Sequence, residues 1–192
     1  MTTVRRSLLA ALTAAAVLTV PASTHAADTY LALKGGVWAP TAQDGISGIT
    51  GIASGRFPAS GDVELAYGAT MGIIGAQISG GYMWSELNGV KANAVPLYVL
   101  GQLRLPIFFI QPYLELGIGG LANFASAQIS GATVTGTKFS FLAIGGAGVD
   151  FILGPILLGA EARYMYVSEE TFDWGSMKLS GVNVTVNLGY VF

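Results

Sequence analysis

Cysteine is absent from this 192-residue chain, and charged residues make up only 10% of it. Without cysteine no disulfide can hold the fold, so packing or a closed network of hydrogen bonds must do so. Ordinary soluble domains are about one quarter charged, so this chain is unusually apolar.

Basic residues are also few. Nine Lys and Arg stand against eleven Asp and Glu, and the isoelectric point is near 5.2. A nucleic-acid-binding protein needs clustered cations to neutralise phosphates, and no basic stripe occurs in this chain. We therefore expect no nucleic acid among its partners.

The first 26 residues have the pattern of a secretory signal peptide. Two arginines precede an almost unbroken apolar run over residues 7–20, and Thr24-His25-Ala26 offers a small-x-small cleavage site. An apolar run of this length is too short to cross about 30 Å of hydrocarbon as a helix. We expect residues 1–26 to be a cleaved signal peptide and residues 27–192 to form one mature domain.

The expected mature chain has little that could perform catalysis. Its only histidine is lost with the signal peptide, so it lacks the commonest general base, the thiol nucleophile and the usual zinc ligands. Ser168 beside Glu169 and Glu170 comes nearest to a nucleophile with a carboxylate, but adjacent residues at a strand end point to opposite faces. We expect a protein that is not an enzyme and has no cofactor or metal.

The end of the chain alternates between two kinds of side chain. Every second position is apolar, and the positions between them are small or polar apart from Val191. A period of two predicts a strand with one apolar face and one polar face. The apolar positions are Val182, Val184, Val186, Leu188, Tyr190 and Phe192.

Residues 139–160 are apolar enough to suggest a transmembrane helix, with Asp150 as their single charge. However, Leu153-Gly154-Pro155 is a turn signal between two alternating runs. In the second run a hairpin places Glu161 and Arg163 on one face, whereas a helix would scatter the charges around its circumference. The pattern therefore predicts a hairpin.

The same alternation runs through the whole expected mature chain. Most of the alternating segments are about ten residues or longer, the length that a tilted strand needs to cross a membrane. Short turns alternate with longer loops, as in bacterial barrels. Because backbone groups in lipid must be paired, such strands can span only as a closed sheet. The predicted strands are Tyr30–Trp38, Asp62–Met71, Ile74–Glu86, Ala92–Leu105, Gln111–Ser126, Lys138–Leu153, Ile156–Ser168 and Lys178–Phe192.

We therefore predict an all-β fold: an eight-stranded antiparallel up-and-down transmembrane β-barrel in which the last strand pairs with the first. With the N-terminus on the periplasmic side, the outward aromatic residues sort into two belts, as expected at two membrane interfaces. The alternative is that aromatic residues simply favour strands. The outer belt would hold Tyr82, Trp84, Phe124, Phe139, Phe141, Tyr164 and Tyr166, and the inner belt Phe151, Tyr190 and Phe192.

The inward positions collect charged residues from several strands. A cation facing lipid at mid-membrane would cost about 2–4 kcal/mol, whereas inside the barrel opposite charges can pair. Inward glycines should leave room for the long Arg and Lys side chains. Asp150 shares the inward parity, and we expect it near the inner rim in contact with water. The predicted luminal charges are Lys34, Glu64, Arg104, Glu115, Glu161 and Arg163, and the inward glycines are Gly68, Gly81, Gly117, Gly119, Gly146 and Gly148.

Two interpretations of this cluster remain. In the first, three cations and three carboxylates form a structural plug that cross-links the barrel. In the second, the charges rearrange and line a narrow channel or proton path. Equal charges of both signs, and an interior that side chains can fill, favour the plug.

Two long connections, residues 39–61 and 127–137, are the obvious places for recognition of a surface ligand. Both are rich in small and hydroxyl-bearing residues and carry almost no charge. They could contact polysaccharide, lipid or protein, or could be plain connectors.

Several segments resemble the outer membrane protein β-barrel domain family, which includes the outer membrane protein A and X types and opacity-like porins. The resemblance rests on residues 30–36, 93–97, 111–119, 145–150 and 158–164 and on the terminal strand. It implies the fold above, outer-membrane residence and a C-terminal assembly signal at Leu188, Tyr190 and Phe192, but no reaction.

From these features we expect a non-enzymatic protein of the bacterial outer membrane that serves envelope integrity or surface interaction. Its expected partners are outer membrane lipids and the barrel assembly machinery. The alternative function is a narrow channel for small solutes or ions.

Overall fold

The computed structural model of the chain describes residues 28–41, 46–47, 58–87, 90–129, 132–168, 170–172 and 175–192. The predicted signal peptide and most of the predicted 39–61 loop lie outside these residues.

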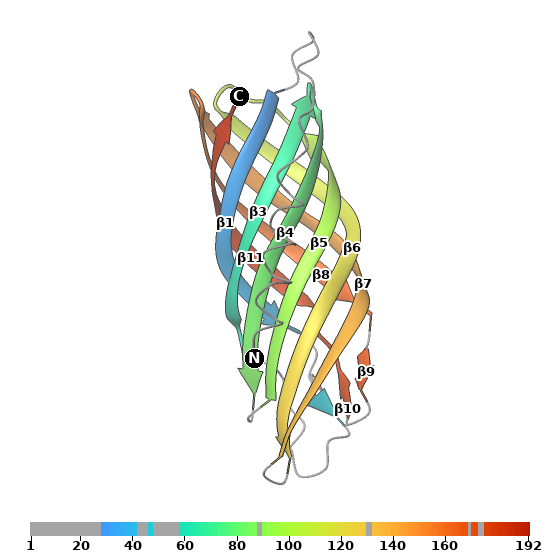
Figure 1. Ribbon diagram of the computed structural model, residues 1–192. Helices are drawn as coiled ribbons and strands as arrows, with labels where there is room; N and C mark the ends of the chain where they lie inside the picture. The colour runs from blue at the N-terminus through green and yellow to red at the C-terminus, as the bar shows by residue number, and fades with distance from the viewer. Residues whose placement is uncertain are drawn as a thin grey trace.

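Eight strands form a closed antiparallel barrel with the order β1-β11-β8-β7-β6-β5-β4-β3 (Figure 1). Strands that follow one another along the chain are also neighbours in the barrel, so the predicted up-and-down arrangement is confirmed. The strands are β1 (Asp28–Pro40), β3 (Ser60–Met71), β4 (Ile74–Leu87), β5 (Val90–Arg104), β6 (Ile110–Ile129), β7 (Ala132–Leu153), β8 (Ile156–Val167) and β11 (Gly181–Val191).

The first and last strands close the barrel, as the sequence predicts. β1 pairs with β11 from Tyr30 opposite Val191 to Pro40 opposite Gly181, and it pairs with β3 along its other edge. Backbone hydrogen bonds between Thr29 and Phe192 extend this seam to the last residue of the chain. Closure pairs the backbone groups of both edges, which a strand surrounded by lipid requires. We call the end that holds Asp28 and Phe192 the terminal rim, and the end that holds Pro40 and Gly181 the far rim.

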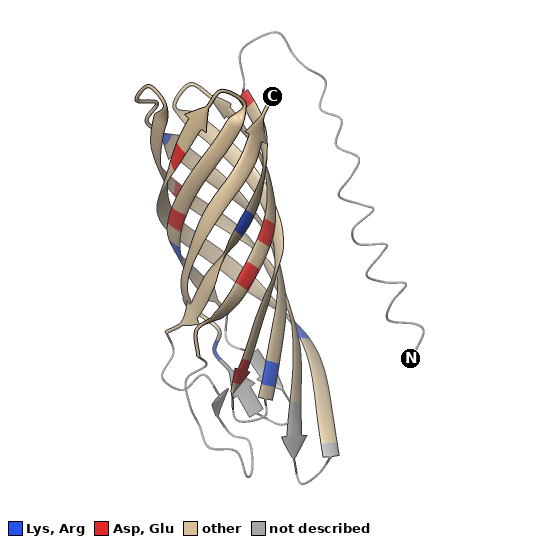
Figure 2. Cartoon of the chain, turned by 90° about the vertical axis from the view of Figure 1, so that its left-hand side faces the viewer, with Lys and Arg blue, Asp and Glu red and all other residues tan. Residues whose placement is uncertain are grey.

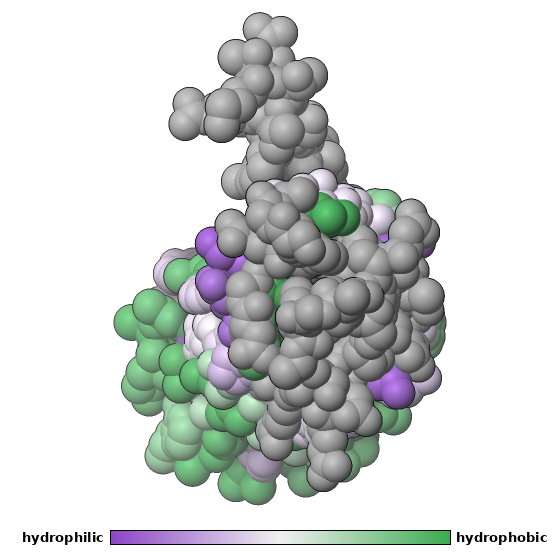
Figure 3. Space-filling model, turned by 90° about the horizontal axis from the view of Figure 1, so that it is seen from below, coloured by the Kyte–Doolittle hydropathy of each residue, from purple (hydrophilic) through white to green (hydrophobic). Residues whose placement is uncertain are grey.

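The period of two decides which side chains face inward. In β5, buried and more exposed residues alternate from Val90 to Arg104. Most outward positions are apolar, and the inward positions hold most of the polar residues of the strands. Seen from the far rim, hydrophobic side chains gather on the described wall of the barrel (Figure 3).

Residues 139–160 form the predicted hairpin and not a transmembrane helix. These residues belong to β7 and β8, which pair from Leu142 opposite Val167 to Leu153 opposite Ile156. Within the part of the chain that the structure describes, no helix is long and apolar enough to cross a membrane.

The tight turns lie at the terminal rim. Gly72 and Gly154 have φ angles of 62° and 63°, values in the left-handed region that glycine adopts without strain. The third connection at this rim, between β5 and β6, instead has Phe108 with a φ of 57°.

The predicted loop at residues 127–137 is wrong for most of its length. β6 continues to Ile129 and β7 begins at Ala132, so the two strands form one long hairpin that extends beyond the other strands at the far rim (Figure 1). The segment contains Thr133, Val134 and Thr135, whose β-branched side chains favour an extended backbone. The lack of charge suggested a loop, but strand propensity and pairing between β6 and β7 prevail.

Two smaller differences occur at the same rim. β11 begins at Gly181, so residues 178–180 of the predicted last strand lie before it. Short strands β2 (Ile46–Ser47), β9 (Glu170–Phe172) and β10 (Gly175–Met177) form a separate three-stranded sheet there. Segments of two or three residues are too short to show a periodic signal in sequence.

Candidate functional site

Charged side chains are buried inside the barrel. The structure places all six predicted luminal residues there, each no more than 3% exposed. Charged positions occur along the height of the barrel strands (Figure 2). These six residues are Lys34, Glu64, Arg104, Glu115, Glu161 and Arg163.

Arg163 on β8 connects several walls of the barrel. Its Nη2 donates to Glu64 on β3, and its Nη1 donates to the hydroxyl of Tyr98 on β5. Its Nε donates to Oδ1 of Asn183 on β11 at 3.2 Å, and Nη1 lies 3.0 Å from Oε1 of Glu161. Because each contact comes from a different strand or a different level, this guanidinium cross-links the lumen.

Glu161 forms a second centre. Its Oε2 accepts hydrogen bonds from Nζ of Lys34 at 2.7 Å, from the hydroxyl of Tyr113 at 2.8 Å and from Nδ2 of Asn187 at 3.4 Å. Charge-assisted hydrogen bonds of this kind are among the stronger ones in proteins. They offset the cost of taking the carboxylate and the ammonium out of water.

Arg104 on β5 pairs with Asp150 on β7, and this corrects the expected solvation of Asp150, although the residue does lie near the end of β7 at the terminal rim. The Nη1–Oδ2 distance is 2.8 Å, and Asp150 is only 2% exposed rather than in contact with water. Arg104 reaches into the lumen, where its guanidinium carbon lies 4.6 Å from the ring centre of Tyr113 and 5.3 Å from that of Tyr30. Gly159 makes room for Asp150, because a Cβ there would lie 2.1 Å from Oδ1.

Two glutamines link the Arg104 pair to the rest of the interior. Oε1 of Gln102 accepts from Nη2 of Arg104 at 2.8 Å, and its Nε2 donates to Oε2 of Glu115 at 3.2 Å. The hydroxyl of Tyr30 donates to Oε1 of Gln77 at 2.9 Å. Tyr113 connects this group to Glu161, because its ring lies against Arg104 and its hydroxyl donates to that carboxylate.

The inward glycines leave room for tyrosine side chains more often than for lysine or arginine. The expectation that they accommodate Lys and Arg is therefore wrong for most of them. A Cβ on Gly68 would lie 2.3 Å from the ring of Tyr30, and one on Gly148 would lie 2.4 Å from the ring of Tyr113. Of the six, Gly146 alone faces a cation, Arg163. The others face different side chains: Gly81 faces Glu64, Gly117 faces Leu100 and Gly119 faces Tyr98.

The described interior has more carboxylates than the predicted set. Asp62 and Asp150 are 1% and 2% exposed, which makes five buried carboxylates against three buried cations. Asp62 accepts a hydrogen bond from Nδ2 of Asn183 at 2.6 Å and lies 3.9 Å from Arg163. Asp62 lies two residues before Glu64 and therefore on the same face of β3, which is the sequence signal that could have identified it. The predicted balance of three against three is therefore wrong.

Apolar side chains occupy the rest of the described lumen. Toward the far rim, buried residues such as Trp38, Met83, Leu142 and Met165 form one cluster. Toward the terminal rim, Tyr30 packs in a smaller cluster with Ala32, Ala66 and Leu157. Ion pairs and apolar side chains together fill the described interior.

The described residues hold no group of three or more His, Cys, Asp or Glu side chains arranged for a metal ion. A mostly apolar groove of about 430 Å³ crosses β1, β3, β8 and β11, with Lys34 and Asn187 also among its lining residues, and a cavity of about 380 Å³ lies at the far rim beside Trp84.

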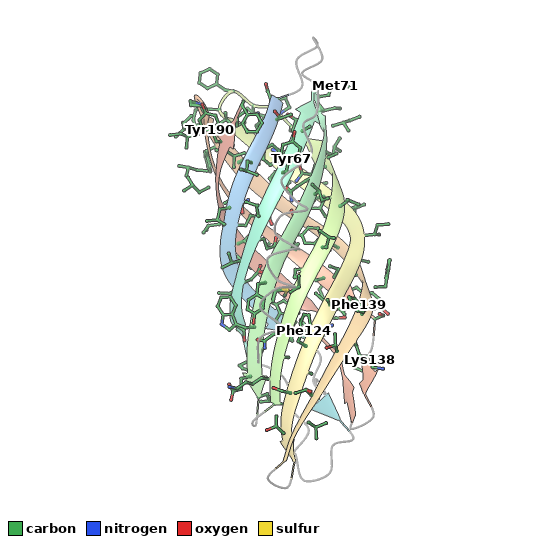
Figure 4. All side chains as sticks on the ribbon, in the orientation of Figure 1. Tyr67, Met71, Phe124, Lys138, Phe139 and Tyr190 are labelled. Carbon is green, nitrogen blue, oxygen red and sulfur yellow. The ribbon has the colours of Figure 1, made fainter. Side chains whose placement is uncertain are left out.

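The proposed assembly residues point away from the lumen. Leu188, Tyr190 and Phe192 are 58%, 55% and 62% exposed, and the two rings stack with their centres 6.1 Å apart. Tyr190 lies toward the terminal rim with Tyr67 and Met71, whereas Phe124 and Phe139 lie nearer the far rim (Figure 4). Outward aromatic residues therefore occur at two levels. The sequence expectation did not include Tyr67.

A closed barrel with an apolar outside and a charged, filled inside is the architecture of small β-barrels of the bacterial outer membrane. The structure thus defines the chain as an eight-stranded transmembrane β-barrel of the outer-membrane type.

Solved structures agree with this class. The fold is similar to that of Neisserial surface protein A, with a TM-score of 0.61 and 12% sequence identity over 86% of this chain and 97% of that one. A major outer membrane protein from Thermus thermophilus matches with a TM-score of 0.57 and 14% identity over 88% and 100%. Ail, the attachment invasion locus protein of Yersinia pestis, matches with a TM-score of 0.51 and 14% identity over 86% and 99%. At these identities the likeness concerns the fold.

No family model matches the chain, and no curated protein matches it by sequence.

Proposed function

We propose that the protein is a non-enzymatic integral protein of the outer membrane with a closed barrel, serving envelope integrity or surface interaction. The observation that carries the proposal is the buried network around Arg163, which joins β3, β5, β8 and β11 across the lumen. A pore needs a continuous path of water, but here buried ion pairs and two apolar clusters occupy the interior.

The energetics favour a static plug over a gate. Removing one partner of a buried ion pair typically costs about 3–5 kcal/mol, because the remaining charge loses its compensation. Opening a path through the lumen would separate several such pairs together, including Lys34–Glu161 and Arg104–Asp150. The interior of an eight-stranded barrel is just wide enough for side chains to fill it or for one small ligand, and here buried side chains occupy it.

Conductance tests this part of the proposal. We expect the purified, folded protein to produce no current steps in planar lipid bilayers. A sample kept unfolded before addition is the control for contaminants and detergent. Reproducible single-channel steps that need the folded protein would overturn the closed barrel and support the narrow channel.

The long β6–β7 hairpin is our candidate for surface interaction. Pairing between β7 and β8 begins at Leu142, so residues 132–141 extend past the end of β8 (Figure 1). We assign the far rim to the cell exterior, since longer connections face outward in bacterial barrels.

An epitope tag tests this orientation. A tag inserted between residues 129 and 132 should bind antibody on intact cells. A tag at Gly154, in the tight turn of the terminal rim, should bind only after the outer membrane is opened. The reverse pattern would overturn the orientation. In isolated outer membranes, a gel band whose mobility shifts on boiling would verify that each variant folds.

A further inference from the structure

The three connections at the terminal rim are apolar throughout. They span residues 71–74, 105–109 and 153–156 and contain no charged residue. Their side chains are exposed: Met71 by 68%, Ile74 by 64%, Ile107 by 61% and Leu153 by 53%. Exposed apolar patches of this kind mark sites of contact with a membrane or another protein.

Phe108 is the most exposed of these side chains. It is 93% exposed, and it stands at the tip of a turn closed by two hydrogen bonds between Ile107 and Ile110, of 2.9 and 3.0 Å. Its φ of 57° is a left-handed value, which the corresponding turns reach with Gly72 and Gly154. A large side chain in this conformation is uncommon and carries strain. The turn therefore presents a phenyl ring where glycine would be the easier residue.

The β5–β6 turn lies far from the charges of Asp28 and the chain terminus at the terminal rim. Asp28 and the chain terminus at Phe192 lie at the β1–β11 seam. The β5–β6 turn lies opposite that seam, three strands away in either direction. The charges nearest to it along the chain, Arg104 and Glu115, face the lumen, and so does Asp150, the partner of Arg104.

The turn continues the surface that faces lipid. On β5 the outward residues Val99 and Leu103 are 52% and 50% exposed, and Leu105, directly after the strand, is 55% exposed and leads to Ile107. On β6, Leu114 and Leu116 continue the same face. No polar belt interrupts the apolar surface between the strands and the tip.

We propose that the turns of the terminal rim, with Phe108 foremost, insert into the lipid of the adjacent leaflet instead of projecting into water. The occupant of this surface is the boundary between headgroups and acyl chains. Aromatic residues flank the apolar band of transmembrane barrels at this boundary, and transfer of apolar surface out of water favours insertion. The inference rests on the barrel spanning a membrane.

Single cysteines provide a clean test because the chain has none of its own. Phe108→Cys would carry a nitroxide spin label in vesicles of phosphatidylcholine and phosphatidylglycerol. Collisions with oxygen, which concentrates in lipid, would be compared with those of a water-soluble nickel complex. Leu116→Cys is the reference for lipid, and Lys91→Cys, whose native side chain is 61% exposed at the far rim, is the reference for water.

We expect the label at position 108 to collide with the nickel complex several-fold less often than the label at 91, and to resemble the label at 116. A label at 108 that behaves like the one at 91 overturns the proposal, and protection that appears only in native envelopes also does so, since it would indicate a protein partner. If Phe108→Cys does not fold, Ile107→Cys and Leu153→Cys apply the same criterion. Water access at position 116 would instead contradict membrane spanning itself.

Discussion

Arg163 on β8 and Glu64 on β3 form an ion pair inside the barrel, although 99 positions separate them in the chain. Two strands, β11 and β1, lie between their own strands along the shorter path of the wall. Both side chains are wholly removed from water. The pair therefore ties together walls that backbone hydrogen bonds do not connect directly.

Replacing Arg163 should destabilise the barrel strongly. Arg163→Met leaves Glu64 and Glu161 buried beside an apolar group, so we expect the free energy of unfolding to fall by about 3–5 kcal/mol. Urea unfolding in lipid vesicles measures it. The matched control is Lys91→Met, whose exposed partner Glu86 is 3.9 Å away and which should change stability by less than about 1 kcal/mol. Equal effects of the two substitutions would contradict a supporting role for the network.

The two neighbouring carboxylates Glu161 and Glu115 should respond differently to the same substitution. Glu161 pairs with Lys34 and Arg163, whereas Glu115 accepts one hydrogen bond from Gln102 and forms no ion pair with a described residue. Glu161→Gln should therefore cost about 3 kcal/mol or more, and Glu115→Gln about 1 kcal/mol or less. The same urea experiment compares them, and a larger loss for Glu115→Gln would refute the assigned pairing.

Two glycines provide a packing test. Gly146→Ala places a Cβ 2.5 Å from that of Arg163 and 2.7 Å from a backbone oxygen, and such overpacking should cost about 1–3 kcal/mol. Gly35→Ala points outward, where nothing lies within 4 Å of the new Cβ, and should leave stability nearly unchanged. A thermal or urea unfolding series checks both variants, and similar losses would show that lumen packing does not decide the effect.

Phe192 should matter for assembly more than for intrinsic stability. If the assembly machinery recognises Leu188, Tyr190 and Phe192, Phe192→Ser should lower the amount of barrel in outer membranes several-fold. Val182→Ser, on the same face of β11, is the control. Quantitative blotting of isolated membranes measures the amounts. Equal depletion by both variants, or failure of purified Phe192→Ser to fold in vesicles, would point to simple destabilisation.

The mature N-terminus offers a direct test of the predicted signal peptide. Mass spectrometry of the protein from outer membranes should find Ala27 as its first residue. A chain that retains residues 1–26 would show that the segment is not cleaved.

The strand pattern could be predicted from the chain alone because the period of two is a local property. Alternation over β11 assigned Leu188, Tyr190 and Phe192 to the outside, and the Leu153-Gly154-Pro155 signal identified the β7–β8 turn from three adjacent residues. Closure followed because a membrane leaves no stable alternative for unpaired strands. The extent of the β6–β7 hairpin could not be predicted in the same way, since weak local signals were overridden by pairing between strands.

Parity likewise placed Lys34, Glu161 and Arg163 on the inward face, but it could not say which charge meets which. Partners inside a barrel depend on the register and tilt of strands distant in sequence, and these bring Asp150 to Arg104 and the ring of Tyr113 over Gly148. The sequence by itself thus determined a closed barrel and which residues face lipid or lumen, because alternation is local and lipid forbids unpaired backbone. Only the tertiary structure decided the ion pairs, the excess of buried carboxylates and the exposed Phe108 turn, because these depend on how the closed sheet brings its walls together.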